Sequence, residues 1–286
     1  MKLKLLFASM LFAANAQAVN MAYVEVNSNY FANARCFINS NKQSFFGMAS
    51  IFAANINGKN PNQPEIYLNP QVTQTLNSSQ IDEMHAQGIK VLLTILGNHQ
   101  NAGWACTTDE KAALNFADDV ANLVEQYHLD GIDIDDEYSK CATNSTSLIM
   151  MAKAIKSHPK FKGKLLTKAL FNDIQYFNAS YQGHHLSDYL DYGFEMTYFS
   201  GDFNNRLAPY QQAGMSMKQL MIGGNANSMS PDPYKMGEFS RAKQSAGVMV
   251  YDIKKEMIKQ YIPQLQKGLT DGQSTVSVIE GCLVSS

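Results

Sequence analysis

The chain has 286 residues, of which 45% are hydrophobic and 17% are charged, and its formal net charge at pH 7 is -2. This length suits one large domain or two small ones, and the hydrophobic fraction is ample for one large core. The near-neutral charge gives no electrostatic reason to expect a nucleic acid or an anionic membrane as a partner, so we expect neither.

Residues 1–18 have the pattern of a secretory signal peptide. A short basic start precedes a mostly apolar run over residues 5–14, and a small-x-small site predicts cleavage after Ala18. The apolar run is too short to span a bilayer. A buried N-terminal helix is the alternative. The pattern predicts a mature domain of residues 19–286 that is secreted or periplasmic.

Short β-rich runs then alternate with segments of helical periodicity. Eight runs are predicted as strands, over residues 22–27, 50–55, 90–96, 131–135, 164–170, 192–198, 219–223 and 247–251. Helices are predicted over residues 78–87, 109–127, 145–157, 232–244 and 254–265. Eight such repeats favour a (β/α)8 TIM barrel in one domain, with its active site at the C-terminal ends of the strands. A doubly wound open sheet is the alternative.

The fourth predicted strand leads into Asp133, Asp135 and Glu137, spaced two residues apart. Side chains at this spacing lie on one face of a strand, and in a barrel that face points inward. Like charges in a low-dielectric site raise one another's pKa, which suits a protonated carboxylic acid near neutral pH. Glycosidases need such an acid beside a second carboxylate. We expect no metal or cofactor; a Ca²⁺ or Mg²⁺ site and a solvated strand end are the alternatives.

The run from Asp130 to Glu137 matches the DGxDxDxE signature of glycoside hydrolase family 18. A closer resemblance, to the endo-β-N-acetylglucosaminidase H type within that family, covers residues 23–27, 51–57, 88–100 and 129–138. The resemblance implies a retaining hydrolase that cuts the β-1,4 bond between the two core N-acetylglucosamines of high-mannose or hybrid N-linked glycans. It also implies substrate-assisted catalysis, in which the substrate's acetamido oxygen attacks the anomeric carbon and forms an oxazoline.

By motif position, the resemblance assigns Glu137 as the general acid and then as the base for the incoming water. Asp135 would orient the acetamido N–H and balance the oxazolinium charge. Asp133 would lie beneath it and share a proton or a hydrogen bond. Tyr198, in a Met-x-Tyr element at the end of the sixth strand, would donate to the acetamido carbonyl. An aromatic side chain that only packs at the barrel rim is the alternative for Tyr198.

Further residues at the predicted mouth are expected to bind substrate. They follow the third, fifth and eighth strands, and they are Asn98, His99, Trp104, Asn172 and Tyr251. His99 would contact substrate or brace its loop, and Trp104 would stack on a sugar or anchor its loop.

Four cysteines in an exported chain suggest two disulfides, with three possible pairings. Cys106 and Cys141 fall in the loops after the third and fourth predicted strands, which lie side by side at the mouth of a barrel. We therefore favour a bridge between these two, which leaves Cys36 with Cys282 by elimination.

Two rival functions share the acidic motif. A chitinase would use the same acids on a polymer, but long chitin grooves usually carry several Trp residues and this chain has 1. A catalytically inactive carbohydrate-binding relative would commonly lack the final acid, and Glu137 is present. We therefore expect a monomeric endo-β-N-acetylglucosaminidase whose partners are the N-linked glycans of glycoproteins.

Overall fold

A computed structural model describes residues 19–254 and 258–284. The predicted signal peptide therefore lies outside the described residues. Within them, a 9-stranded sheet has the order β1-β10-β9-β8-β7-β6-β5-β3-β4, and an additional pairing of β1 with β3 closes it into a barrel. Strand β4 (Glu65–Tyr67) pairs antiparallel with β3 beside the barrel, whose own strands are all parallel.

The eight β-rich runs of the sequence form the barrel itself. These strands are β1 (Asn20–Glu25), β3 (Phe46–Asn57), β5 (Lys90–Gly97), β6 (Gly131–Asp135), β7 (Leu165–Leu170), β8 (Tyr192–Glu195), β9 (Leu220–Asn225) and β10 (Gly247–Tyr251). The TIM-barrel prediction is confirmed, because β1 bonds both to β10 and to β3, so the eight parallel strands form a closed ring and not a doubly wound open sheet.

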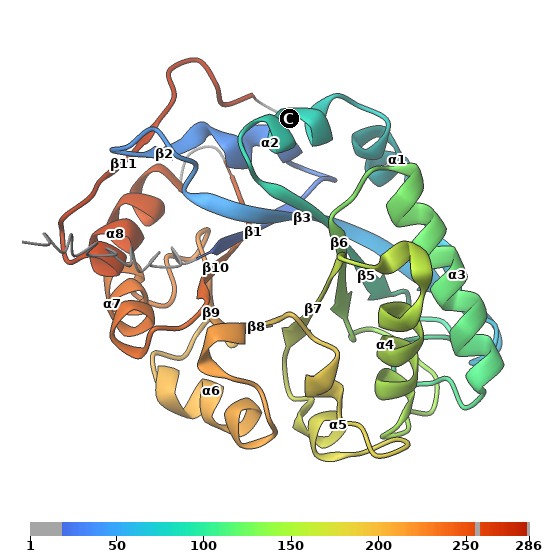
Figure 1. Cartoon of the computed structure of the whole chain (residues 1–286). Helices are drawn as coiled ribbons and strands as arrows, with labels where there is room; N and C mark the ends of the chain where they lie inside the picture. Colours follow the sequence, from blue (N-terminus) through green and yellow to red (C-terminus); the bar gives the residue numbers. More distant parts are fainter. Residues whose placement is uncertain (1–18, 255–257, 285–286) are drawn as a thin grey trace, which may run out of the picture.

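Helices surround the barrel (Figure 1). The α-helices are α1 (Pro70–Leu76), α2 (Gln80–Ala86), α3 (Glu110–Gln126), α4 (Ser147–Ser157), α5 (Ile174–Asn178), α6 (Phe203–Gln212), α7 (Pro233–Lys243) and α8 (Ile258–Thr270). The predicted helices correspond to α2, α3, α4, α7 and α8, although the start predicted for the last one includes residues 255–257, which are outside the described part. No described helix is long and apolar enough to cross a membrane.

Short elements complete the fold. Four 3₁₀ turns are η1 (Phe31–Cys36), η2 (Pro159–Phe161), η3 (Leu186–Asp188) and η4 (Met217–Gln219). Strand β2 (Phe37–Asn39) pairs antiparallel with β11 (Val276–Val278), which joins the first loop to the C-terminal segment. The long polar stretch between the first two barrel strands is thus an ordered addition to the minimal fold.

Strand periodicity sorts the core into two layers. Side chains that point inward form a separate apolar cluster in the barrel, made of Met21, Tyr23, Met48, Leu92, Phe194, Met221 and Met249. Alternate residues such as Ala22 and Val24 join the larger core between the strands and the helices. The phase of each strand therefore decides which side chains reach the barrel interior.

Both predicted disulfides are confirmed. The Cα atoms of Cys36 and Cys282 are 5.7 Å apart, and those of Cys106 and Cys141 are 5.9 Å apart. The first bridge ties η1 to the segment after β11, and the second joins the loops that follow β5 and β6.

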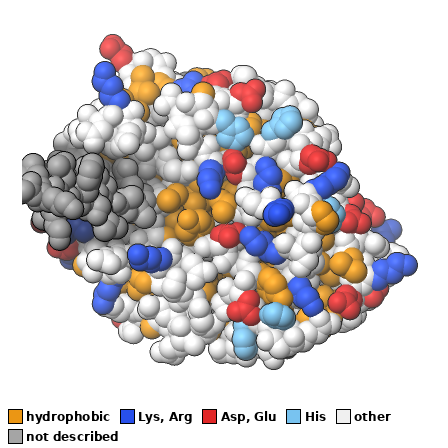
Figure 2. All heavy atoms as spheres, in the orientation of Figure 1, with side chains coloured by type: hydrophobic (Ala, Val, Ile, Leu, Met, Phe, Trp, Pro, Cys, Tyr) orange, Lys and Arg blue, Asp and Glu red, His pale blue; other side chains and the backbone are white. Residues whose placement is uncertain are grey.

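The strands follow one another clockwise around the axis in Figure 1. Right-handed crossovers run anticlockwise when seen from the C-terminal ends, so this view looks onto the amino-terminal ends of the strands. In the same orientation, Figure 2 shows basic and acidic side chains interspersed around apolar side chains near the middle of the face. The candidate catalytic residues belong to the opposite end of the barrel.

The two disulfides predict different losses of stability when removed. The bridge from Cys36 to Cys282 joins residues 246 positions apart, and the bridge from Cys106 to Cys141 joins residues 35 positions apart. A longer closed loop restricts the unfolded chain more. Chain entropy gives losses in the free energy of unfolding of roughly 5.5 kcal/mol for Cys36→Ala/Cys282→Ala and roughly 4 kcal/mol for Cys106→Ala/Cys141→Ala. Urea denaturation of both variants measures this order, and a reversed order would contradict it.

Candidate active site

Asp130 and Gly131 fix the start of the acidic strand. Asp130 Oδ2 accepts a hydrogen bond from Val91 N at 2.8 Å and lies 2.8 Å from His85 Nε2. A Cβ on Gly131 would lie 2.0 Å from Leu165 O on the neighbouring strand, so the close approach requires glycine. Strand β6 is thereby held in register between β5 and β7, with its acids pointing inward.

Asp133 is fully buried in the barrel and accepts three hydroxyl hydrogen bonds. The donors are Tyr23 Oη at 2.7 Å, Thr94 Oγ1 at 3.1 Å and Thr167 Oγ1 at 2.6 Å. Burial raises the pKa of Asp133 to about 6, while these three hydrogen bonds act in the opposite direction. Since the hydroxyls stabilise the charged form, Asp133 can carry a negative charge at neutral pH despite its burial.

Asp135 is also buried, but its environment differs. Among the described residues, its Oδ1 atom is buried without a hydrogen-bond partner. Burial raises the pKa of Asp135 well above its usual value, and the negative charges of Glu137 and Asp133 raise it further. The two buried aspartates therefore differ, because hydroxyl donors favour the charged form of Asp133 whereas burial and the neighbouring charges favour the protonated form of Asp135.

Glu137 follows the strand and is half-buried. Burial raises the pKa of its carboxyl, the charge of Asp136 adds to the effect, and the cation of Lys168 opposes it. A carboxylic acid whose pKa is raised and whose position is accessible has the property that a general acid needs.

Tyr198 and Tyr251 lie against each other at the mouth. Their ring centroids are 5.8 Å apart and their planes differ by 14°. Burial raises the pKa of Tyr198 well above its usual range, and the charge of Asp135 adds to this effect, so the phenol remains a donor. Burial, together with the charge of Asp252, raises the pKa of Tyr251 to about 12. The ends of three strands thus bring the predicted tyrosines and acids together.

Three other predicted substrate contacts lie around this mouth. Asn98 donates from Nδ2 to Asn57 Oδ1 at 2.7 Å. His99 is exposed, with its ring 5.4 Å from that of Tyr138. Asn172 is exposed after β7 and lines a cleft at the rim. Their contacts with substrate stay predictions.

The prediction that Trp104 binds substrate is wrong. Its side chain is 0% exposed, and its indole N–H donates to Ile95 O at 2.8 Å. The ring packs edge-on against Phe116 of α3, with centroids 5.4 Å apart. Trp104 therefore anchors the loop after β5 to the barrel wall and offers no face to a sugar.

Several site residues were missed by the sequence analysis. Tyr23, Thr94 and Thr167 belong to predicted strands, and their inward phase matches that of Asp133, so strand phase could have found them. Phe199 and Tyr138 are exposed aromatics, at 81% and 55%, that directly follow Tyr198 and Glu137. Sequence gave no signal for these two, because exposure in a loop depends on how the loop folds.

A buried lysine offsets part of the negative charge. Lys168 on β7 forms an ion pair with Asp173 and donates to Ala169 O at 2.8 Å. Asp173 also accepts a hydrogen bond from Tyr210 Oη at 2.7 Å. The lysine lowers the pKa of the acids around it, including Asp136, against the effect of burial. In residues 19–254 and 258–284, no group of three or more His, Cys, Asp or Glu side chains could hold a metal ion.

The buried carboxyl of Asp133 makes a pH-dependent contribution to the free energy of unfolding. Burial raises the pKa of Asp133 from 3.8 to about 6, so between these values the unfolded chain ionises while the folded chain does not. The free energy of unfolding then falls as the pH rises through this window, by roughly 3 kcal/mol for this group. Asp133→Asn should remove this component, as urea denaturation at about pH 4 and about pH 7 measures. The same pH dependence in both proteins would contradict the assignment.

Comparison with known proteins agrees with this geometry. A family model described as glycosyl hydrolases family 18 matches residues 8–230. An endo-beta-N-acetylglucosaminidase of Flavobacterium sp. (strain SK1022) is 46% identical over 129 residues, which are 44% of this chain and 41% of that protein. Endo-beta-N-acetylglucosaminidase F1 of Elizabethkingia meningoseptica is 27% identical over 208 residues, which are 68% of this chain and 61% of that protein. This chain thus covers less than two thirds of either relative.

The fold is also similar to that of EndoBT-3987 of Bacteroides thetaiotamicron. Its crystal structure with a Man5GlcNAc product has a TM-score of 0.77 at 21% identity, over 93% of this chain and 63% of that chain. A second structure of that protein, with a Man9GlcNAc2Asn substrate, has a TM-score of 0.76 at 20% identity. Because the family model matches well over half of its residues, this chain belongs to glycosyl hydrolases family 18.

Proposed function

We propose that this chain is an endo-β-N-acetylglucosaminidase that hydrolyses the β-1,4 bond between the two core N-acetylglucosamines of high-mannose or hybrid N-linked glycans. The acidic signature and the buried carboxyls support a family 18 hydrolase. Two relatives carry the name of this activity, and EndoBT-3987 has been crystallised with Man9GlcNAc2Asn. These likenesses support the choice of an N-linked glycan over a chitin polymer.

The observation that carries the proposal is the free Oδ1 atom of Asp135. A buried polar atom without a partner is costly, and native structures rarely keep one without a reason. In the described residues this atom has no donor, and the carboxyl that carries it is within reach of the charges of Asp133 and Glu137. The acetamido N–H of a bound N-acetylglucosamine is a donor of the kind that this oxygen lacks.

The reaction then proceeds in two steps. Glu137 donates its proton to the glycosidic oxygen, and the acetamido carbonyl oxygen attacks the anomeric carbon as the bond to the leaving sugar breaks. The resulting oxazolinium stays in the site as part of the bound glycan, without a covalent bond to the protein, and the leaving sugar departs with the proton from Glu137. Glu137, now a carboxylate, removes a proton from a water molecule that attacks the same carbon and restores the acetamide. Two inversions give net retention, and the substrate supplies its own nucleophile.

Asp135, Asp133 and Tyr198 serve the acetamido group. When the N–H donates to Asp135, the charged form of this carboxyl gains a hydrogen bond and its proton can pass to Asp133. Asp135 then balances the positive charge of the oxazolinium. The phenol of Tyr198 donates to the acetamido carbonyl and orients it toward the anomeric carbon. Holding the nucleophile in place makes the attack intramolecular, which contributes several kcal/mol to rate acceleration.

The mouth provides surfaces for the rest of the glycan. Tyr251 forms a floor beside Tyr198, and the exposed rings of Phe199 and Tyr138 can stack on sugar faces. The polar rim residues Asn98, His99 and Asn172 contribute hydrogen bonds to hydroxyl groups. We further propose that cleavage after Ala18 releases a monomeric enzyme into the periplasm or the medium.

Glu137→Gln tests the function. The amide keeps the shape of the acid but cannot donate a proton to the leaving oxygen, so we expect a loss of roughly 10²–10⁴-fold in kcat with glycan binding retained. Glu125→Gln, at an exposed glutamate of α3 paired with Lys160, is the matched control. The assay is the mass of a high-mannose glycoprotein after incubation, and the wild type must leave one N-acetylglucosamine per site.

Two results would contradict the proposal. An unchanged glycoprotein together with cleavage of chitin oligomers by the wild type would make the chain a chitinase. Full activity of Glu137→Gln would remove this residue from the role of general acid.

A further inference from the structure

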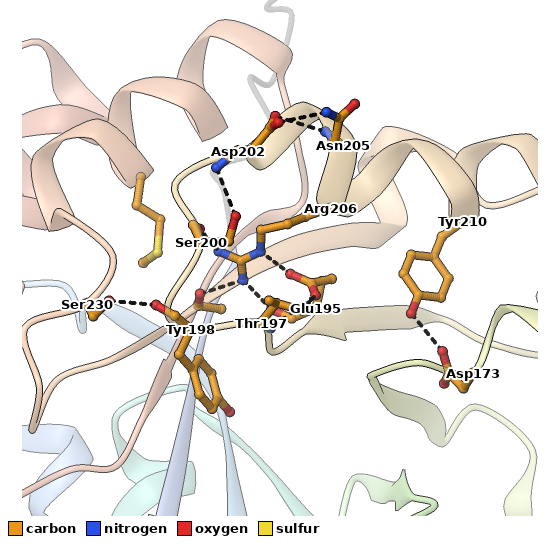
Figure 3. Close-up of polar contacts among 12 residues, drawn as sticks. Asp173, Glu195, Thr197, Tyr198, Ser200, Asp202, Asn205, Arg206, Tyr210 and Ser230 are labelled. Atoms are coloured by element: carbon orange, nitrogen blue, oxygen red, sulfur yellow. Dashed lines mark hydrogen bonds and ion pairs between the residues drawn. The ribbon is translucent and has the colours of Figure 1, made fainter.

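Arg206 is a buried cation that joins three parts of the barrel rim. It lies on α6, and its guanidinium points back to the end of β8 (Figure 3). It forms an ion pair with Glu195, in which both side chains are 4% exposed. Its Nη2 donates to Glu195 O at 3.0 Å and to Gly223 O of β9 at 2.9 Å, and its Nη1 donates to Ser200 O at 2.9 Å.

Glu195 connects this cation to the segment that carries Tyr198. Its Oε1 accepts from Thr197 N at 3.0 Å and also contacts Thr197 Oγ1. From the other side, Ser230 Oγ donates to Tyr198 O at 2.8 Å. These contacts hold the main chain before and after Tyr198, while its ring stacks on Tyr251 at 5.8 Å. The phenol group is thus placed by a frame of polar contacts.

Packing alone does not hold this segment. A cleft of about 350 Å³ borders it, and its lining includes Thr197, Ser200, Asp202, Asn205, Glu195 and Arg206. The segment therefore has open space on one side. A buried ion pair is weak evidence for stability, because apolar residues of similar volume often stabilise a fold as well or better. What apolar side chains cannot do is bind three main-chain carbonyls at once, as the planar fork of an arginine does.

We propose that Arg206 and Glu195 are positioning residues for catalysis: they hold residues 195–200 so that the Tyr198 phenol stays directed at the substrate's acetamido group. This inference rests on the proposed function. Among the described residues, the hydrogen bonds and the ion pair of Arg206 and Glu195 reach none of Asp133, Asp135 and Glu137, so we assign their effect to Tyr198. A misplacement of about 1 Å at a catalytic group can cost on the order of 10²-fold in rate, so a small shift of this segment matters.

Arg206→Lys tests the proposal. Lysine keeps a positive charge opposite Glu195, but it lacks the fork that reaches the carbonyls of Ser200 and Gly223. We expect kcat on a high-mannose glycopeptide to fall by roughly 10- to 100-fold, with a smaller change in KM. Arg241→Lys is the matched control, since Arg241 lies on the neighbouring α7 and donates to Gly268 O. It should keep the wild-type kcat.

The Tyr198→Phe background separates positioning from a general structural effect. If Arg206 acts through the phenol, adding Arg206→Lys to Tyr198→Phe produces little further loss of kcat, because the coupled group is already absent. Wild-type kcat in Arg206→Lys, or an equal loss in both backgrounds, would overturn the proposal. If Arg206→Lys does not fold, Thr197→Val removes the hydroxyl contact with Glu195, and an unchanged kcat in that variant would overturn it.

A crystal structure of Arg206→Lys provides a readout that needs no activity. We expect the Tyr198 ring to leave its stack on Tyr251, and an unchanged stack at 5.8 Å would contradict the inference. This readout also separates the two hypotheses. A wild-type protein that leaves the glycopeptide uncut refutes the proposed function, whereas the position of the ring still decides the role of Arg206.

Discussion

The central constraint on this structure is the burial of two carboxyl groups, those of Asp133 and Asp135, inside the barrel. Three hydroxyl groups from three different strands converge on Asp133, so the closed barrel supplies donors that partly offset the cost of burying this carboxyl. Within the described part of the chain, Oδ1 of Asp135, one layer higher, has no donor, and burial with the neighbouring charges raises the pKa of this carboxyl. The asymmetry between two neighbouring aspartates sets which of them can receive a donor from a substrate. The proposed donor is the acetamido N–H of the glycan.

The rest of the mouth keeps this arrangement rigid. A Cβ on Gly97 would lie 2.1 Å from Glu137 O, so glycine lets the segment that carries Glu137 approach β5 closely. Trp104 anchors the loop above β5, and the bridge from Cys106 to Cys141 joins this loop to the one after the acidic strand. On the opposite side, Arg206 fixes the segment of Tyr198. The segments that carry Glu137 and Tyr198 are therefore held in place by two separate sets of buried contacts. Fixed positions for both groups suit the proposed reaction, in which the nucleophile belongs to the substrate.

Periodicity and the acidic motif predicted the barrel strands and the acidic residues of the site. Features that depend on tertiary contacts were missed. The acidic strand could be found because alternate acids on a β-rich run are rare and expensive. Helix α5 was missed because five residues show no period, and α6 because it is polar and contains Pro209. Trp104 was assigned to the wrong role, since sequence cannot distinguish a buried loop aromatic from an exposed one. Tyr23 was within reach, because it lies on the first predicted strand and alternation along that strand places it inside the barrel.

The most direct test of the central claim is the titration of the two aspartates by carbon-13 NMR of selectively labelled protein. The account predicts that Asp133 titrates with a pKa of about 6 and that Asp135 keeps its proton well above its usual range. Assignment through Asp133→Asn and Asp135→Asn separates the two signals. If both carboxyls instead titrate near 3.8, the barrel does not raise their pKa values and the account of the site is wrong.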